Sequence, residues 1–321
     1  MNGPEKGVAD DFGRLHTYLR LSVTDACNYR CVYCGPAAAH VGLSTDQMVD
    51  LCSIFYSMGI KVLRITGGEP TVRSDIVTLT SRLADIGFDR LSMTTNGEYL
   101  CRYAMDLKKA GLDSINISLD ATEDSLYESL TGGFHVRAVL DGLQAALDAG
   151  LLVKLNCVPL ASCFERQAVQ LMEVAAAYKV PVRFIELMPF GNGARCTGAS
   201  FPLLQQFLED RFGGGQLIPE GMISGCGPAI YRNYAGVSVG FITAISDCFC
   251  DRCNRLRLTA RGRLKSCLYS NKYLDVQALV TQGLPQVDIE KRIREFVAKK
   301  PARHGAGRKD MAEEPLSTFG G

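Results

Sequence analysis

The chain has 321 residues, 47% of them hydrophobic, which is enough for one large α/β domain or two smaller ones. A formal net charge of +1 excludes the broad electrostatic attraction with which many proteins bind nucleic acid or an acidic membrane, so an anionic ligand needs a local cluster of Arg and Lys. Residues 1–12 lack the basic and apolar parts of a signal peptide, and no run approaches the roughly 18 apolar residues of a membrane span.

Six extended apolar segments recur at intervals of roughly 25–35 residues, the spacing of strand–helix units. They are rich in Val, Ile, Leu and Thr, as buried parallel strands are. The predicted strands are 18–24, 61–66, 90–95, 114–119, 151–158 and 181–188. Helical patterns follow at 44–58, 74–86, 99–110, 136–149, 165–178 and 201–212, the first of them opening with a capping box at Ser44 and Gln47. The alternation predicts an α/β fold in the form of a partial (βα)6 barrel, because eight units are needed to close one.

The pattern changes after Gly213-Gly214-Gly215. Short strands linked by turns are predicted at 230–235, 239–245, 256–259 and 263–268, and helical stretches at 274–281 and 286–299. We therefore divide the chain into a barrel domain at 1–212, a C-terminal cluster- and substrate-binding region at 213–299, and a flexible tail at 300–321.

Distinctive polar motifs fall just after the predicted strands. Because parallel strands end on one face, where α/β barrels keep their active sites, we expect these motifs to meet at one mouth. They are C-N-Y-R-C-V-Y-C, Gly67-Gly68-Glu69-Pro70, Thr94-Thr95-Asn96-Gly97, Ser118-Leu119-Asp120, Asn156 and Glu186-Leu187-Met188-Pro189.

The first of these motifs holds Cys27, Cys31 and Cys34 in the spacing C-x₃-C-x₂-C. Three thiolates on one short loop suit a 4Fe–4S cluster with one iron left open for a ligand. A closed structural site takes four protein ligands instead. Zinc with a distant fourth ligand, or three buried apolar thiols, remain alternatives at this point.

With CxxxCxxC after the first strand and GGEP after the second, the chain resembles the radical S-adenosylmethionine enzymes. The resemblance implies that the open iron holds the methionine part of S-adenosylmethionine, whose cleavage gives a 5′-deoxyadenosyl radical. It also implies that S-adenosylmethionine is contacted by Tyr33, Gly67, Gly68, Glu69, Ser118 and Met188. Taken alone, Ser118 is equally suited to a turn and Met188 to filling a gap in the core.

A second set of three cysteines, Cys250, Cys253 and Cys267, lies in the C-terminal region as C-x₂-C-x₁₃-C. We interpret it as a second three-thiolate 4Fe–4S site with an open iron. A zinc knuckle with an unseen ligand is the alternative. Cys248, two residues before Cys250, is an alternative ligand that would shift the spacing of this set.

Two such sites make the chain resemble the GTP 3′,8-cyclase family of molybdenum cofactor biosynthesis. The resemblance covers nearly the whole chain and includes R-I-T-G-G-E-P-T, F-I-E-L-M-P, C-x₂-C-N-R-L-R-L-T and a final Gly-Gly. It implies that the first cluster binds S-adenosylmethionine and the second binds the base of GTP. The radical then takes hydrogen from ribose carbon 3′, and attack on guanine carbon 8 gives 3′,8-cyclo-7,8-dihydro-GTP.

The same resemblance implies a set of GTP contacts: Arg20, Arg64, Thr94, Lys154, Arg255, Leu256 and Arg257. A triphosphate carries about four negative charges, which a near-neutral protein must meet locally with Arg and Lys. The resemblance further implies that Arg255, Arg257 and the terminal Gly320-Gly321 assist catalysis. A solvated strand face would also explain Lys154 and the two arginines, and a disordered tail would explain Gly320-Gly321.

Thirteen cysteines without a secretory signal indicate reduced thiols and metal rather than disulfides, so we expect a cytoplasmic protein. The resemblance implies an electron donor such as flavodoxin or ferredoxin and a downstream cyclic pyranopterin monophosphate synthase, for a monomer or homodimer that binds neither nucleic acid nor membrane. The alternative function is a radical enzyme that modifies a peptide, but such enzymes generally carry more C-terminal cysteines. An electron carrier or zinc protein is the third class considered. Gly35-Pro36-Ala37 departs from the family pattern, so the resemblance does not predict how this loop packs over the first cluster.

Overall fold

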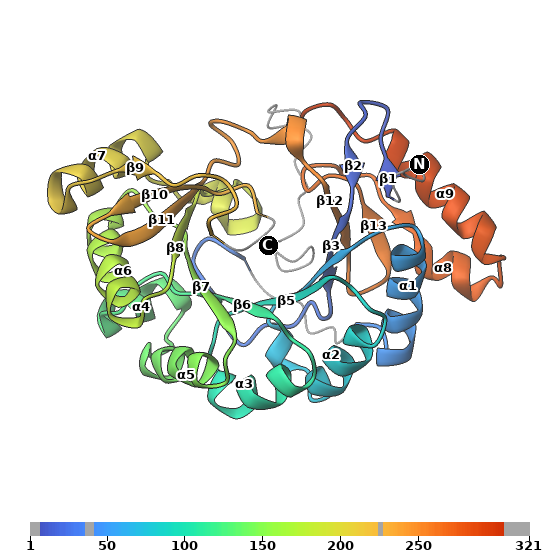
Figure 1. The fold of residues 1–321 in the computed structure, drawn as a ribbon, viewed down its shortest axis with the longest axis horizontal. Coiled ribbons are helices and arrows are strands. Elements are labelled where there is room, and N and C mark those ends of the chain that lie inside the picture. Colours follow the sequence, from blue (N-terminus) through green and yellow to red (C-terminus); the bar gives the residue numbers. More distant parts are fainter. Residues whose placement is uncertain (1–6, 36–41, 224–226, 305–321) are drawn as a thin grey trace.

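A curved sheet with helices on its outer face forms most of the molecule (Figure 1), and the computed structural model describes residues 7–35, 42–223 and 227–304. Six parallel strands follow one another in chain order, as the sequence predicts for a partial barrel, and each agrees with its predicted range within three residues. They are β3 (Tyr18–Ser22), β4 (Val62–Thr66), β5 (Arg90–Thr95), β6 (Ser114–Ser118), β7 (Leu152–Cys157) and β8 (Val182–Ile185).

The helices predicted between these strands are also present. They are α1 (Thr45–Ser57), α2 (Ile76–Ala84), α3 (Leu100–Lys109), α5 (Arg137–Asp148), α6 (Phe164–Tyr178) and α7 (Phe201–Phe212). The capping box of α1 forms as predicted, with the Ser44 hydroxyl accepting from the Gln47 backbone. The sequence analysis missed α4 (Asp124–Thr131), which has 8 residues and ends at Gly132 in a left-handed conformation. A helix of about two turns is too short for its periodicity to stand out.

The C-terminal region extends the same sheet at both edges. Strand β11 (Val237–Ile242) pairs in parallel with β8, and β12 (Arg255–Leu258) pairs in parallel with β3. Beyond β11 lie antiparallel β10 (Ile230–Tyr234) and β9 (Gln216–Leu217), and beyond β12 lie antiparallel β13 (Arg263–Lys265) and β14 (Leu274–Asp275). The short predicted strands exist, but their parallel docking onto the barrel was not foreseen.

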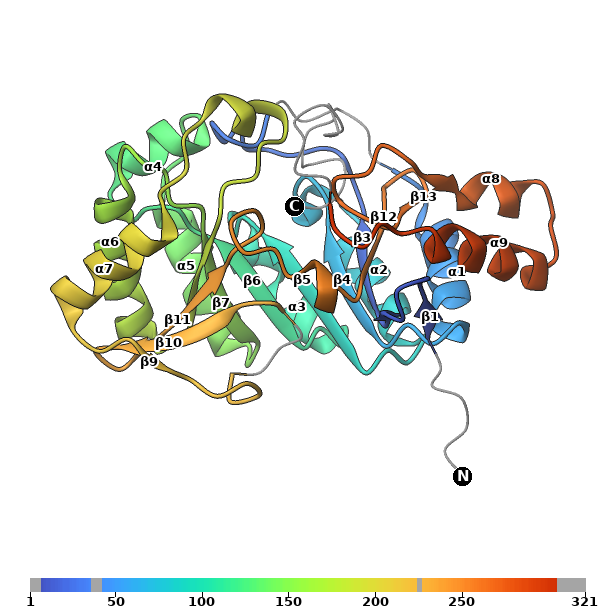
Figure 2. The same ribbon diagram turned by 90° about the horizontal axis from the view of Figure 1, so that it is seen from above.

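The remaining elements cover the β12 side of the sheet. The hairpin of β1 (Val8–Ala9) and β2 (Leu15–His16) contacts α9 (Gln286–Ala298), and α8 (Val276–Thr281) lies beside α1. Figure 2 shows α8 and α9 next to α1, at the end of the molecule opposite α6 and α7. No helix among the described residues is long and apolar enough to cross a bilayer.

Strand alternation decides which side chains face the interior of the barrel. In β12, Leu256 and Leu258 are fully buried in the hydrophobic core, while Arg255 and Arg257 point to the concave side. The neighbouring β3 repeats the pattern, because its Leu19 pairs with Leu256 and its Arg20 pairs with Arg257. The period of two therefore places leucines against the helices and arginines in the interior.

Candidate active site

The first cysteine set lies on the loop after β3, and this loop is held from outside by α4. The backbone of Arg30 donates to Thr131 at 3.0 Å and that of Val32 to Leu130 at 2.9 Å. The Tyr29 ring stacks on Phe134 with their centroids 4.2 Å apart. Helix α4, which was not predicted, therefore fixes the loop that carries Cys27, Cys31 and Cys34.

The GGEP loop supports the same segment from inside. The backbone of Gly68 donates to Thr24 at 2.8 Å, and the backbone of Glu69 donates to Ala26 at 2.8 Å. A Cβ on Gly68 would lie 2.2 Å from the Ala26 carbonyl oxygen. Glycine is therefore required here for contact between two protein backbones, directly before Cys27.

The Glu69 carboxylate joins this loop to the next one. It accepts hydrogen bonds from the backbone and hydroxyl of Thr71, from the Thr95 hydroxyl and from the Asn96 backbone. Burial raises the pKa of Glu69, while these hydrogen bonds act in the opposite direction. Since Thr95 and Asn96 belong to the motif after β5, these hydrogen bonds position the two motif loops relative to one another.

Replacing Gly68 with alanine is expected to lower the unfolding free energy by about 1–3 kcal/mol and to release the iron of the first site, because the added methyl group displaces the loop before Cys27. Gly111→Ala is the matched control: its Cβ would lie 2.7 Å from that of Ala84, in the helical layer. The control should destabilise the fold without losing iron. Iron analysis and thermal unfolding check both, and full iron content in Gly68→Ala would contradict the assigned role.

The sulfur spacing of the two cysteine sets argues against zinc. In neither set do all three sulfur atoms lie within 4.8 Å of one another, although all six cysteines are described. A tetrahedral zinc ion with Zn–S bonds of ~2.3 Å would bring its sulfurs to about 3.8 Å. A cubane separates its thiolates, since each binds a different iron. In each set at least one pair of sulfurs is therefore farther apart than a zinc tetrahedron requires, which is compatible with a 4Fe–4S cluster.

Among the described residues, no cation lowers the pKa of Cys27 or Cys31 in the first set. Burial raises the pKa of Cys27 to about 12, and burial together with Asp120 raises that of Cys31 well above its usual value. Such thiols release their protons to solvent when they bind metal. The hydroxyl of Tyr33 donates to Asp120, so the predicted S-adenosylmethionine contact Tyr33 is anchored beside this set.

The second set has the opposite electrostatic setting. Burial alone would raise the pKa of Cys253, but Lys300, the Arg255 backbone and the Arg255 and Arg257 guanidinium groups together lower it. The Lys300 ammonium group lies 3.4 Å from the Cys253 sulfur and donates to the Arg255 carbonyl at 3.0 Å. The sequence analysis did not single out Lys300, which lies 47 residues from Cys253 in the chain.

The two halves meet at a small apolar cluster. Phe190 and Leu268 are its buried members, and Cys34, Met188 and Tyr269 pack against them. The cluster brings the loop of the first cysteine set against the segment that follows Cys267. Ser118, a further predicted contact, ends β6 and pairs with Asn156 on β7.

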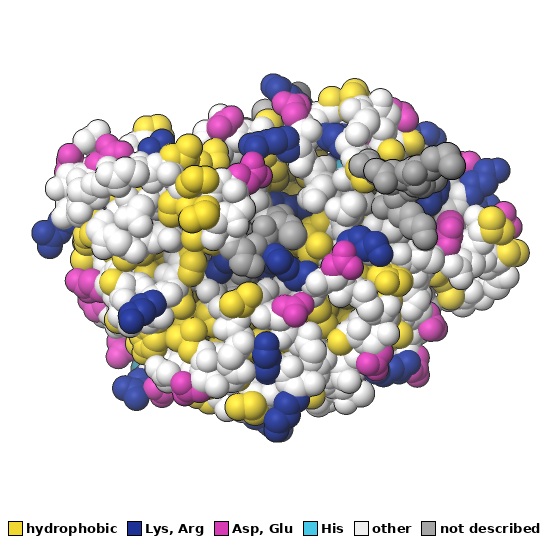
Figure 3. All heavy atoms as spheres, viewed as in Figure 1, with side chains coloured by type: hydrophobic (Ala, Val, Ile, Leu, Met, Phe, Trp, Pro, Cys, Tyr) yellow, Lys and Arg dark blue, Asp and Glu magenta, His cyan; other side chains and the backbone are white. Residues whose placement is uncertain are grey.

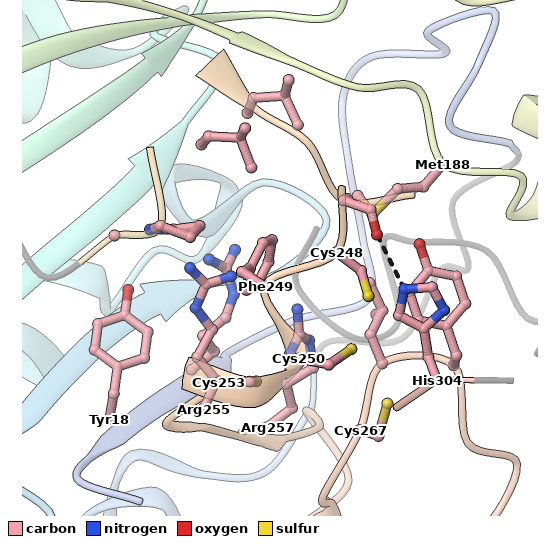
Figure 4. A pocket seen from close by; sticks show the side chains of 18 of the residues that line it. Tyr18, Met188, Cys248, Phe249, Cys250, Cys253, Arg255, Arg257, Cys267 and His304 are labelled. Atoms are coloured by element: carbon pink, nitrogen blue, oxygen red, sulfur yellow. Dashed lines mark hydrogen bonds between the residues drawn. The ribbon is translucent and has the colours of Figure 1, made fainter. Parts of the chain in front are cut away.

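A cavity fills the concave side of the sheet between these parts (Figure 4). Most of the predicted GTP contacts line it together with the second cysteine set: Arg20, Arg64, Thr94, Arg255, Arg257, Cys250, Cys253 and Cys267. Met188 lines it as well. Figure 3 shows dark blue Lys and Arg side chains around the central hollow of this face. Of the motifs predicted to meet at one mouth, those with Thr94, Asn156 and Met188 contribute to the lining, whereas the first cysteine set and the GGEP loop do not.

Two predicted GTP contacts are not among the residues that line the cavity. Lys154 is absent from the cavity lining, and its ammonium group lies 3.4 Å from the Tyr231 hydroxyl on β10. Leu256 faces the core with its side chain fully buried. Gly320-Gly321 and Pro36-Ala37 fall outside the described residues.

The cavity is strongly positive. Within the described parts of the chain, Arg64, Arg183, Arg255 and Arg257 have no carboxylate partner, and the buried Nε of Arg257 has no hydrogen-bond partner at all. Burial and then repulsion from Arg255 lower the pKa of Arg257. Buried guanidinium groups without counter-ions indicate a site for an anion.

The pKa of a tyrosine in the cavity reflects the same positive charge. The Arg64 side chain donates to the Tyr18 hydroxyl. The pKa of Tyr18 falls to about 8: burial would raise it, but Arg64, Arg20 and Arg255 outweigh burial.

The sequence analysis missed Arg183, whose guanidinium group enters the cavity from β8 and donates to Asn156 at 2.5 and 2.9 Å. A charge inside an otherwise apolar strand was the available signal. Phe249 was also missed; the Arg255 guanidinium lies 4.8 Å from its ring centroid, within cation–π range. Asn116 completes the polar lining from β6.

An incomplete parallel barrel with a three-cysteine loop after its first strand, a GGEP loop after its second and a cavity at its mouth defines a radical S-adenosylmethionine enzyme. A family model described as Radical SAM superfamily matches residues 21–162, and one described as Molybdenum Cofactor Synthesis C matches residues 180–306. The chain belongs to the GTP 3′,8-cyclase family, and its cofactors are 4Fe–4S clusters and S-adenosylmethionine.

Individual relatives support this membership. A GTP 3′,8-cyclase of Pelotomaculum thermopropionicum is 39% identical over 92% of this chain and 95% of its own length. One of Heliobacterium modesticaldum is 38% identical over 98% of this chain and 100% of its own length. The crystal structure of Streptococcus suis SuiB bound to precursor peptide SuiA aligns with a TM-score of 0.66 over 90% of this chain and 66% of that one. Its 13% identity shows a shared fold alone.

Proposed function

We propose that this chain converts GTP into 3′,8-cyclo-7,8-dihydro-GTP, the first step of molybdenum cofactor biosynthesis. Family membership supports the reaction type. The observation that carries the proposal is the cavity in which Arg64, Arg183, Arg255 and Arg257, which have no carboxylate partner among the described residues, lie beside the second cysteine set. A nucleoside triphosphate needs this pairing of a positive pocket for its phosphates with a separate site for its base.

The two cysteine sets suit two clusters with separate roles. Cys27, Cys31 and Cys34 would hold one cluster, and Cys250, Cys253 and Cys267 the other. When bound, the first cluster with S-adenosylmethionine supplies a 5′-deoxyadenosyl radical that takes hydrogen from ribose carbon 3′. The protein's own contribution is to bind, orient and exclude water.

The arginines are proposed to bind and orient the triphosphate. Arg20, Arg64 and Arg183 enter the cavity from three strands, and Arg255 and Arg257 from a fourth. Guanidinium groups in fixed positions hold phosphate oxygens by paired hydrogen bonds. Thr94 adds a hydroxyl beside Arg64, with 3.4 Å between Nη1 and Oγ1. Gly320-Gly321 remains a proposed participant in catalysis.

The partners are proposed as well. The substrate is GTP, electrons come from a donor such as flavodoxin or ferredoxin, and the product passes to a cyclic pyranopterin monophosphate synthase. We place the reaction in the cytoplasm because thirteen cysteines must stay reduced. A peptide substrate is the alternative function, and the arginine-lined interior favours the triphosphate over it.

The test is anaerobic reconstitution to about eight irons per chain, two 4Fe–4S clusters, followed by dithionite, S-adenosylmethionine and a nucleotide. GTP should give 5′-deoxyadenosine and a cyclised nucleotide, whereas ATP and ITP should give markedly less of the cyclised product. Intact clusters with no GTP-dependent deoxyadenosine would overturn the proposal. Equal turnover of ATP would overturn its specificity for the guanine base.

A further inference from the structure

Three side chains on the wall of the cavity form a cluster of which the proposed function uses only Cys250. The sulfurs of Cys248 and Cys250 and a ring nitrogen of His304 all lie within 4.8 Å of one another. Cys248 and Cys250 precede and open the short 3-10 helix η3 (Cys250–Arg252), and His304 follows α9. Figure 4 shows the three gathered at one side of the cavity, away from Tyr18.

The histidine ring is already oriented for metal binding. Its Nε2 lies 3.1 Å from the Ala244 carbonyl oxygen, which can only accept, so Nε2 carries the proton. The lone pair is therefore on Nδ1, which is buried and has no hydrogen-bond partner among the described residues. The ring also stacks on Tyr269 with centroids 4.3 Å apart. A histidine that ligates metal through one nitrogen while its other N–H is held by a carbonyl is the usual arrangement.

The types of ligand atom determine which metal ion the site suits. Two thiolates and one imidazole suit Zn²⁺, with bonds of about 2.3 Å to sulfur and 2.0–2.1 Å to nitrogen. Such bonds place ligand atoms about 3.5–3.8 Å apart, within a small adjustment of the observed cluster. The set offers no oxygen ligand, so it does not suit Mg²⁺ or Ca²⁺. The fourth position would open into the cavity, since all three residues line it.

We propose that Cys248, Cys250 and His304 form a mononuclear zinc site that is mutually exclusive with the second 4Fe–4S cluster. The exclusion follows because Cys250 belongs to both ligand sets, and one thiolate cannot complete both. The zinc site stands on the geometry of the cluster itself, whereas the exclusion rests on the ligands proposed for the second cluster. In a chain without clusters, zinc would thereby bind Cys248 and Cys250 and prevent the second 4Fe–4S cluster from assembling.

The metal site is tested on the full chain, prepared cluster-free under reducing anaerobic conditions in a Cys31→Ala background that breaks the first cysteine set. Titration with Co²⁺ should give one equivalent with thiolate charge-transfer and tetrahedral ligand-field bands, which Zn²⁺ then abolishes. Cys248→Ser and His304→Gln should each weaken Zn²⁺ binding by more than roughly 100-fold. Cys101→Ala, on the exposed face of α3, is the control and should change nothing.

Cys253→Ala separates the two ligand sets, because Cys253 belongs to the proposed cluster and not to the zinc site. It should keep the zinc equivalent and lose the second cluster, while Cys248→Ser should lose zinc and keep the second cluster. Unchanged zinc affinity in Cys248→Ser and His304→Gln would overturn the proposal. Loss of zinc in Cys253→Ala would overturn it too, since zinc would then occupy the cluster ligands.

Exclusion is measured by reconstituting chains with an intact first cysteine set after loading with zinc. Wild-type protein should take up about four irons instead of about eight, and Cys248→Ser should recover the full content. The absorption spectrum and electron paramagnetic resonance of the reduced clusters identify which one is missing. Eight irons bound together with one retained zinc would refute exclusion.

Discussion

Replacing Cys253 with alanine is expected to reduce cyclisation of GTP to background while S-adenosylmethionine is still cleaved to 5′-deoxyadenosine. Cys253 belongs to the C-terminal set, beside Lys300 and the cavity arginines. The Cys27 loop is supported separately, by α4 and by the GGEP loop. Losing the C-terminal ligand therefore removes the proposed site for the base and leaves the first site intact.

The measurement is a time course of deoxyadenosine and cyclised nucleotide, with iron analysis of the same samples. Cys253→Ala should retain about four irons. Cys31→Ala should lose both products, because the first site starts the reaction. Cys101→Ala, at an exposed position, should lose neither. Equal loss of both products in Cys253→Ala would contradict the division of labour between the two sites.

Strand and helix positions were predictable because their signals are local. Leu256 and Leu258 alternate with two arginines, and this period of two determines both the strand and the face on which each side chain lies. The cysteine spacings were equally local, and three thiols within eight residues need no tertiary information. The convergence at one mouth followed from the single rule that parallel strands end on one face.

The features that were missed depend on contacts between distant segments. Nothing local says that β12 docks in parallel against β3, 237 residues earlier, as Arg255 pairs with Tyr18. Lys300 and His304 reach the second cysteine set only after α9 returns the chain to it. Lys154 lies on the same face of β7 as Asn156, as parity predicts, but its ammonium group lies near Tyr231 on β10 and the residue is not in the cavity lining.

Arg257→Met is expected to weaken GTP binding strongly and, in the absence of GTP, to leave the protein as stable as wild type or more stable. The guanidinium group is buried, its Nε has no partner, and Arg255 repels it. Removing one of several like charges relieves repulsion, and methionine fills much of the same volume. With GTP bound, the substitution removes a partner of the phosphate, which costs about 2–5 kcal/mol, or roughly 30-fold to 5,000-fold in affinity.

Two measurements separate these effects: equilibrium dialysis with GTP under anaerobic conditions, and thermal unfolding with and without GTP. Wild type should gain stability from GTP, whereas Arg257→Met should start at or above the wild-type melting temperature and gain little. The control is Arg137→Met, which removes an exposed arginine that pairs with Asp141 on α5 and should change both readings only slightly. Iron content decides the interpretation. If Arg257→Met also loses iron, the arginine stabilises the second cysteine set and its effect on GTP is indirect; if iron stays and affinity falls, the positive cavity binds the triphosphate.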